Sequence, residues 1–111
     1  MTGVEDVTKN YLVTISATGA TKIDELTAQP TVDELQRGVG DGHIEIVPGF
    51  SHLLGRACVA FCHEEGKLEG QPINRYATAL WHAQEPRFIG RDVLVGQICV
   101  VVGTPKFLRD L

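Results

Sequence analysis

The chain has 111 residues, 43% of them apolar and 22% charged, with a formal net charge of −4 at pH 7. A chain of this length forms one domain and buries roughly two thirds of its extended surface, so we expect it to fold without metal or disulfide crosslinks. The mild negative charge argues against a protein that binds nucleic acid through clustered lysine and arginine side chains.

The chain carries no pattern typical of a membrane or secreted protein. No apolar run approaches the roughly 18 residues of a membrane span. The start is acidic and lacks the basic-then-apolar pattern of a signal peptide. The three cysteines have no regular spacing and do not indicate a disulfide framework. We therefore expect a cytoplasmic protein with reduced cysteines.

The first quarter of the chain predicts a polar tail followed by β structure. Residues 1–9 are polar and are expected to form a disordered tail. Residues 11–16 alternate in polarity, which is typical of a strand with one buried face. After a turn at residues 18–20, residues 21–26 are compatible with either a short strand or a loop.

A short helix and a second strand follow. Thr31 and Glu34 have the spacing of a capping box, in which each side chain accepts a hydrogen bond from the other residue's N–H group. Gly38 and Gly40 are expected to end this helix after about two turns, because glycine adopts the left-handed C-cap conformation without strain. Residues 43–47 alternate again and predict the second main strand.

The second half of the chain predicts two more strands and one helix. Residues 57–62 are apolar on both faces, which is typical of a central strand covered from two sides. Residues 74–84 predict a turn or two of helix capped by Asn74. Residues 92–102 predict the last strand, with a bulge or bend at Gly96.

These elements together predict one α+β domain over residues 10–103. Its core is a small mixed or antiparallel sheet of four to five strands, with two short helices packed on it. Residues 104–111 are expected to form a C-terminal tail.

The polar segment between residues 63 and 79 is the candidate functional site. Backbone requirements explain much of it, because Gly66 is expected to supply a positive φ in a tight turn and Asn74 to cap the next helix. The alternative is a recognition surface in which Lys67, Asn74 and Arg75 donate hydrogen bonds to an anion such as a nucleotide phosphate. The candidate residues for binding a ligand or partner are Glu64, Glu65, Lys67, Asn74, Arg75 and Tyr76.

Neither a metal centre nor a catalytic site is predicted. On a strand, Cys58 and Cys62 share one face while His63 points to the other, so the three side chains do not meet at one ion. The run Cys62-His63-Glu64 does not indicate a nucleophilic triad, because adjacent strand residues diverge. No phosphate loop or dinucleotide fingerprint occurs, and we expect no cofactor.

Five segments carry a family resemblance. The most specific is the Glu-Glu-Gly-Lys and Gly-x-Pro-x-Asn run within residues 64–78, and the others are residues 31–36, 42–48, 90–96 and 100–103. Together they resemble domain-of-unknown-function family 3846, and the resemblance extends over roughly residues 11–103. That family is found mainly in bacteriophages, plasmids and actinobacterial genomes.

The resemblance implies a setting and not an activity. Members of the family often lie among small mobile-element genes, some of them concerned with evading host restriction. We therefore expect a small non-enzymatic accessory protein of a phage or mobile element that binds a host protein or a small nucleotide-like ligand, with a counter-defence role in the host cytoplasm. Two alternatives remain open: an enzyme acting on a small phosphorylated or amide substrate, and a nucleic-acid-associated protein.

Self-association is expected through the last strand. Val93, Val95, Val100 and Val102 supply more β-branched surface than an exposed edge strand usually carries. We therefore predict a homodimer with this strand at its interface.

Overall fold

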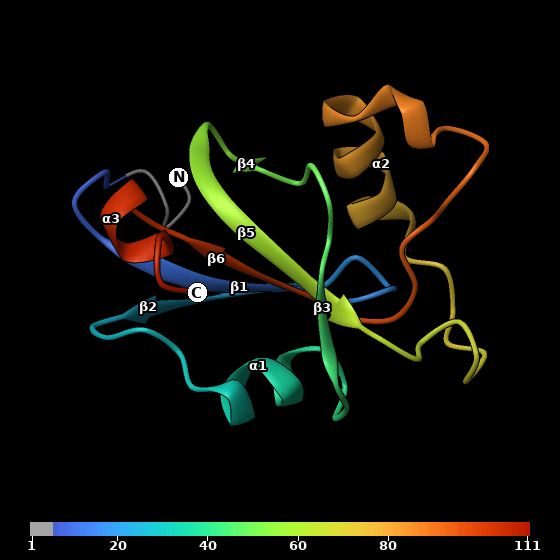
Figure 1. The fold of residues 1–111 in the computed structure, drawn as a ribbon, viewed down its shortest axis with the longest axis horizontal. Coiled ribbons are helices and arrows are strands. Elements are labelled where there is room, and N and C mark those ends of the chain that lie inside the picture. The colour runs from blue at the N-terminus through green and yellow to red at the C-terminus, as the bar shows by residue number, and fades with distance from the viewer. Residues whose placement is uncertain (1–5) are drawn as a thin grey trace.

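The computed structural model describes residues 6–111 of the chain. One antiparallel sheet runs through the molecule, with helices on both of its faces (Figure 1). The strands are β1 (Asn10–Ile15), β2 (Thr21–Leu26), β3 (Ile44–Ile46), β4 (His52–Leu53), β5 (Arg56–His63) and β6 (Ile98–Val102). The helices are α1 (Val32–Gly38), α2 (Arg75–Gln84) and α3 (Pro105–Leu108), with a 3-10 turn η1 (Pro86–Phe88) after α2.

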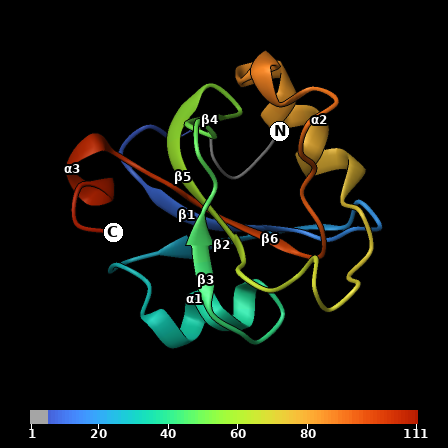
Figure 2. The same ribbon diagram turned by 45° about the vertical axis from the view of Figure 1, so that its right-hand side comes forward.

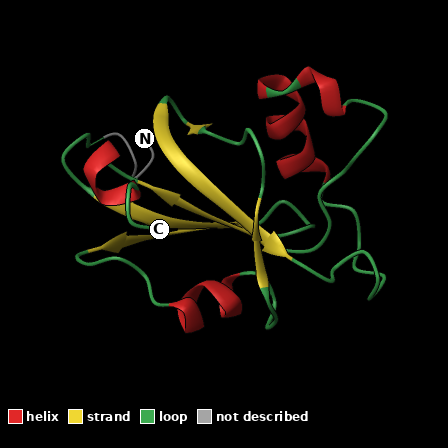
Figure 3. Ribbon diagram, in the orientation of Figure 1, coloured by secondary structure: helices red, strands yellow, loops and turns green. Residues whose placement is uncertain are grey.

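The predicted α+β class is confirmed. The sheet is antiparallel and has six strands, slightly more than the four to five predicted, and a third short helix is present (Figure 3). None of the helices within residues 6–111 is long and apolar enough to cross a membrane.

The last strand in the chain, β6, lies at the centre of the sheet. The strand order is β2-β1-β6-β5-β3, and β4 pairs separately with β5. All five residues of β6 are buried, because β1 and β5 flank the strand and helices cover both sheet faces. The predicted dimer interface along this strand is therefore wrong, since the side chains of Val100 and Val102 are 0% exposed.

Alternation along the strands divides the core into two layers. In one layer, Val13 of β1 and Val100 of β6 pack in the same cluster as Trp81 of α2. In the other, Val101 of β6 packs in the same cluster as Leu35 of α1. Helices α1 and α2 consequently lie on opposite faces of the sheet (Figure 2).

Several local predictions are confirmed. Thr31 Oγ1 accepts a hydrogen bond from Glu34 N–H at 3.1 Å, and Glu34 Oε1 accepts one from Thr31 N–H at 3.0 Å, which completes the capping box. The ambiguous residues 21–26 form β2, which pairs with β1 along its whole length. Residues 104–111 differ from the expected tail: they include α3, and Phe107 and Leu108 of this helix pack against the second core layer.

The strand predicted over residues 92–102 begins only at Ile98. Its first part forms a loop against α2, because the backbone groups of Leu94 find partners there. The Leu94 carbonyl accepts from Asn74 N–H at 2.8 Å, and Leu94 N–H donates to Thr78 Oγ1 at 2.9 Å. Gly96, with a φ of +67°, then turns the chain toward the sheet.

The buried Arg56 side chain ties the N-terminal segment to β5. Its guanidinium donates to the carbonyl oxygens of Asp6 and Lys9 at 2.8 and 2.9 Å. Residues 1–5 of the tail expected over residues 1–9 lie outside the described residues, and residues 6–9 are joined to the domain by these hydrogen bonds.

Truncation of Phe61 tests the second core layer. Phe61 on β5 is 3% exposed, so Phe61→Ala should leave a cavity and lower the free energy of unfolding by about 3–5 kcal/mol. Leu68→Ala is the matched control, because Leu68 is 88% exposed and should be nearly silent. Urea unfolding measures both variants. A loss below about 1 kcal/mol for Phe61→Ala would contradict its position in the core.

Candidate functional site

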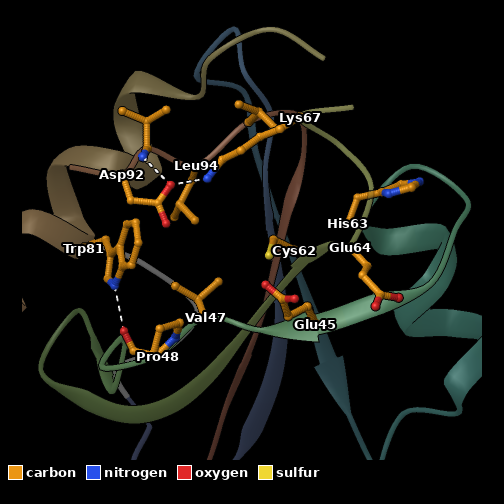
Figure 4. A pocket seen from close by; sticks show the side chains of 12 residues that line it. Glu45, Val47, Pro48, Cys62, His63, Glu64, Lys67, Trp81, Asp92 and Leu94 are labelled. Atoms are coloured by element: carbon orange, nitrogen blue, oxygen red, sulfur yellow. Dashed lines mark hydrogen bonds and ion pairs between the residues drawn. The ribbon is translucent and has the colours of Figure 1, made fainter. Parts of the chain in front are cut away.

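A small cavity lies at the end of β5, between the sheet and α2 (Figure 4). Its volume is about 80 Å³. Its walls come from β3 and the residues that follow it, from α2, and from the loop before β6. The apolar lining residues are Val47, Pro48, Trp81, Val93, Leu94 and Val95. The polar and ionisable ones are Glu45, Cys62, His63, Glu64, Lys67 and Asp92.

An ion pair crosses one side of the cavity's rim. The Lys67 ammonium, from the turn after β5, bonds to Oδ1 of Asp92 (Figure 4). The same oxygen accepts a hydrogen bond from Val93 N–H at 2.9 Å. The other oxygen, Asp92 Oδ2, accepts no hydrogen bond from any residue in the range 6–111. Lys67 is therefore engaged within the protein, while part of the Asp92 carboxylate remains available.

The Cys62 thiol contributes to the cavity from β5. Burial raises the pKa of this thiol to about 11, and the nearby Glu45 carboxylate adds to the increase. Because the thiolate is the nucleophilic form of cysteine, Cys62 is not an activated nucleophile at neutral pH. Burial also raises the pKa of the Cys58 and Cys99 thiols to about 12.

The neighbouring His63 ring points away from the cavity (Figure 4). Its Nδ1 accepts a hydrogen bond from the N–H of Glu65 at 3.0 Å, and its Nε2 lies 3.5 Å from Glu69 Oε1. Glu65, one of the predicted binding residues, is itself exposed. The predicted divergence of Cys62 and His63 is confirmed, and no group of three or more metal-binding side chains occurs in the described part of the chain.

The structure does not gather the predicted binding residues on one surface. Glu64 and Lys67 line the cavity. Arg75 and Tyr76 lie with Ala79, Leu80 and Ala83 on the outer face of α2. The segment thus contributes to two separate surfaces.

Asn74, between these two surfaces, is 0% exposed. Its Oδ1 accepts a hydrogen bond from Ala77 N–H at 3.0 Å, so the predicted helix cap is confirmed. Its Nδ2 donates to the carbonyls of Ile15 and Gly96, both at 2.9 Å. Both amide hydrogens therefore have partners inside the protein, and none is available to an anion.

The predicted backbone role of Gly66 is wrong. Gly66 does not have a positive φ, whereas Gly70, four residues later, has a φ of +70°. Gly66 is instead required for space, because a Cβ atom there would lie 3.0 Å from both Gln71 Oε1 and Val95 Cγ2. The close approach of Gly66 packs the turn against the loop that lines the cavity.

The outer face of α2 carries an apolar strip that the sequence analysis did not identify. Tyr76 and Leu80 are 55% and 38% exposed, and Ala79 and Ala83 lie beside them. We call these four residues the α2 strip. Helical spacing places Tyr76 and Leu80 on one side, so the strip continues for a full helical turn.

The model of one protein family matches residues 9–107, and its description is Domain of unknown function (DUF3846). The family resemblance found in the sequence is thereby confirmed. No curated protein and no solved structure matches the chain. Neither a named relative nor a related structure therefore assigns an activity to the cavity or to the α2 strip.

The high pKa of Cys62 predicts slow alkylation of this thiol. At pH 7 its reaction with iodoacetamide should be at least about tenfold slower than that of free cysteine, and its rate should rise about tenfold per pH unit up to pH 9. Mass spectrometry of the native protein measures the rate, and Cys62→Ala identifies the modified site. A rate close to that of free cysteine at pH 7 would contradict the raised pKa of this half-buried thiol.

Proposed function

Because the chain belongs to the DUF3846 family, whose description assigns no activity, we propose its function from its surface. It is a non-enzymatic binding protein that recognises another protein through the α2 strip. The observation that carries this proposal is the row of exposed apolar side chains on a well-packed helix. Exposed apolar patches of this kind often mark protein–protein contact sites.

Tyr76 is the anchor of the proposed interface. Its ring packs closely over the backbone of Gly19, where an added Cβ atom would lie 2.6 Å from the ring's Cζ. One side of the ring is therefore packed against the protein, although the residue is 55% exposed. Tyrosine is enriched among the residues that dominate protein–protein binding energy, and a side chain that is already restricted loses less entropy on binding.

Arg75 indicates the chemistry of the partner. It lies at the start of the α2 strip, and its side chain forms no hydrogen bond or ion pair with any residue that the structure describes. An arginine in this state can form a bidentate pair with a carboxylate of a partner. The partner is accordingly an amphipathic protein segment with an acidic side chain beside its apolar face.

The cavity does not favour the nucleotide-like ligand considered from the sequence. Pockets for ligands of that size measure roughly 300–1,000 Å³, and this cavity measures about 80 Å³. Its only lysine is already paired with Asp92. The net charge of −4 likewise disfavours nucleic acid as the partner.

Catalysis has little support from the described side chains. The Cys62 thiol is protonated at neutral pH, because its pKa is raised to about 11. Ser51 Oγ lies 3.0 Å from His52 Nδ1, but both residues are exposed and neither lines the cavity. A nucleophile–histidine pair needs a third group to orient the ring, and no hydrogen bond to His52 Nε2 from residues 6–111 supplies one.

The biological setting of this proposal rests on the family resemblance. The protein acts in the cytoplasm of a host cell as an accessory protein of a phage or mobile element, and its partner is a host protein connected with defence. A homodimer formed through the α2 strip is the alternative, because a helix face can also pack against a second copy of itself.

A pair of leucine substitutions tests the α2 strip. Leu80→Asp places a charge in the proposed interface and should reduce partner binding at least about tenfold, with little change in melting temperature. Leu68→Asp makes the same change at a residue that is 88% exposed and lies outside the strip, so it should bind normally. Each full-length variant is purified with an affinity tag from the natural host, and the bound proteins are quantified by mass spectrometry.

The outcomes separate the two forms of the proposal. A host protein lost with Leu80→Asp and kept with Leu68→Asp supports recognition of a host partner. If the lost species is a second copy of the chain, as native mass spectrometry shows directly, the strip is a dimer interface. Equal binding by the two variants would contradict any role for the strip.

A further inference from the structure

We propose that the cavity at the end of β5 binds a small primary alkylammonium ion, with the alkyl chain inside the cavity and the ammonium group at its rim. This site lies on the inner side of α2, where Trp81 packs, and is separate from the α2 strip. It therefore goes beyond the proposed recognition of a protein partner.

The size of the cavity limits the ligand. A cavity needs about 10–15 Å³ of accessible volume to hold one water molecule, so this cavity of about 80 Å³ has room for roughly five to eight non-hydrogen atoms. A linear amine with four carbon atoms has this size. Nucleotides, peptides and most cofactors are excluded by volume.

The interior of the cavity is suited to an alkyl chain. Val47, Trp81 and Leu94 are 2%, 1% and 5% exposed and supply apolar walls. The Cys62 thiol beside them is uncharged at neutral pH and behaves as a small apolar group. The indole of Trp81 adds an aromatic wall to this apolar interior.

The rim of the cavity carries more negative than positive charge. Glu45, Glu64 and Asp92 supply three carboxylates, and the basic side chains among the lining residues are Lys67 and His63, whose ring points away from the cavity. Lys67 is occupied by Asp92 Oδ1, while Glu45 has no ion pair within residues 6–111. An anion would have to displace Asp92 from Lys67 and approach two further carboxylates. A cation is favoured by the same charges.

The arrangement of the carboxylates favours an organic cation over a metal ion. Hard divalent cations need six or more oxygen ligands close together. The described residues include no group of three or more side chains that converges on a common point for a metal. An ammonium ion needs fewer partners and can bond to one carboxylate at the rim, either at the free Asp92 Oδ2 or at Glu45.

The orientation of the ligand follows from burial. Glu45 and Glu64 are exposed, and the side chain of Asp92 is 38% exposed, so the charged groups lie at the solvent side. The apolar walls lie deeper. A free alkylamine can place its alkyl chain against the apolar walls and its ammonium group at the charged rim. A lysine side chain of another protein would enter with its ammonium end leading, so the charge would lie in the apolar part of the cavity.

Three small molecules of similar size test the charge of the ligand. Butylammonium, butanol and butyrate are titrated separately into the full-length protein at pH 7 and followed by heteronuclear NMR. Butylammonium should give saturable shifts of the Leu94 amide and of the Trp81 indole N–H, which donates to the Pro48 carbonyl at 2.7 Å, with a Kd of about 1 mM. Butanol should bind at least about fivefold more weakly, and butyrate should give no shift.

Charge substitutions at the rim should have opposite effects. Glu45→Gln removes a free carboxylate and should weaken butylammonium binding about three- to tenfold. Lys67→Gln releases Asp92 and should strengthen it by a similar factor. Glu65→Gln is the matched control, because Glu65 is exposed but does not line the cavity. Leu80→Asp should leave butylammonium binding unchanged, so this test can fail independently of the α2 strip.

Three results would overturn the proposal. Equal affinity for butanol and butylammonium would show a merely apolar cavity. Equal weakening by Glu45→Gln and Glu65→Gln would show a general effect of surface charge. The absence of saturable shifts at butylammonium concentrations up to roughly 20 mM, 20-fold above the expected Kd, would show that the cavity does not bind this ligand.

Discussion

The carboxamide of Asn74 makes three hydrogen bonds from a fully buried position, and the placement of α2 depends on them. One bond caps the first turn of α2, one reaches the end of β1 at Ile15, and one holds the loop before β6 at Gly96. Three parts of the chain that are far apart in sequence therefore meet at one side chain. A buried polar group of this kind is stabilising only when every partner is in place, so the helix, strand and loop are coupled.

This coupling produces both surfaces that the structure offers for binding. With its N-terminus fixed, α2 turns Trp81 toward the sheet and Tyr76 toward solvent. The loop held by Asn74 supplies Leu94 and Asp92 to the cavity, because the Leu94 carbonyl bonds to the backbone N–H of the same asparagine. The inner side of the helix thus closes a small cavity, and the outer side presents an apolar strip.

The features that the sequence predicted are the ones set by local chemistry. The capping box at Thr31 and the cap at Asn74 each involve residues three positions apart, so the chain alone contains the signal. Asp92 was not identified because it meets Lys67, 25 residues away, only after β5 and α2 have packed. The α2 strip did have a signal, the four-residue spacing of Tyr76 and Leu80, but this spacing is equally typical of a buried helix face. Which face is buried depends on the sheet, and periodicity does not reveal it.

Replacement of Asn74 by aspartate tests the coupling most directly. Aspartate caps a helix as well as asparagine does, but it lacks the two donors and brings a charge toward the carbonyls of Ile15 and Gly96. At pH 7, Asn74→Asp should lower the free energy of unfolding by at least about 3 kcal/mol. Burial should raise the pKa of the introduced carboxyl in the folded state above its value in the unfolded chain. The folded protein therefore binds this proton more tightly than the unfolded chain does. Part of the loss in stability, measured relative to the wild type at the same pH, should consequently be recovered below pH 5. Equal stability of Asn74→Asp and the wild type at pH 7, measured by urea unfolding, would contradict the central role of this amide.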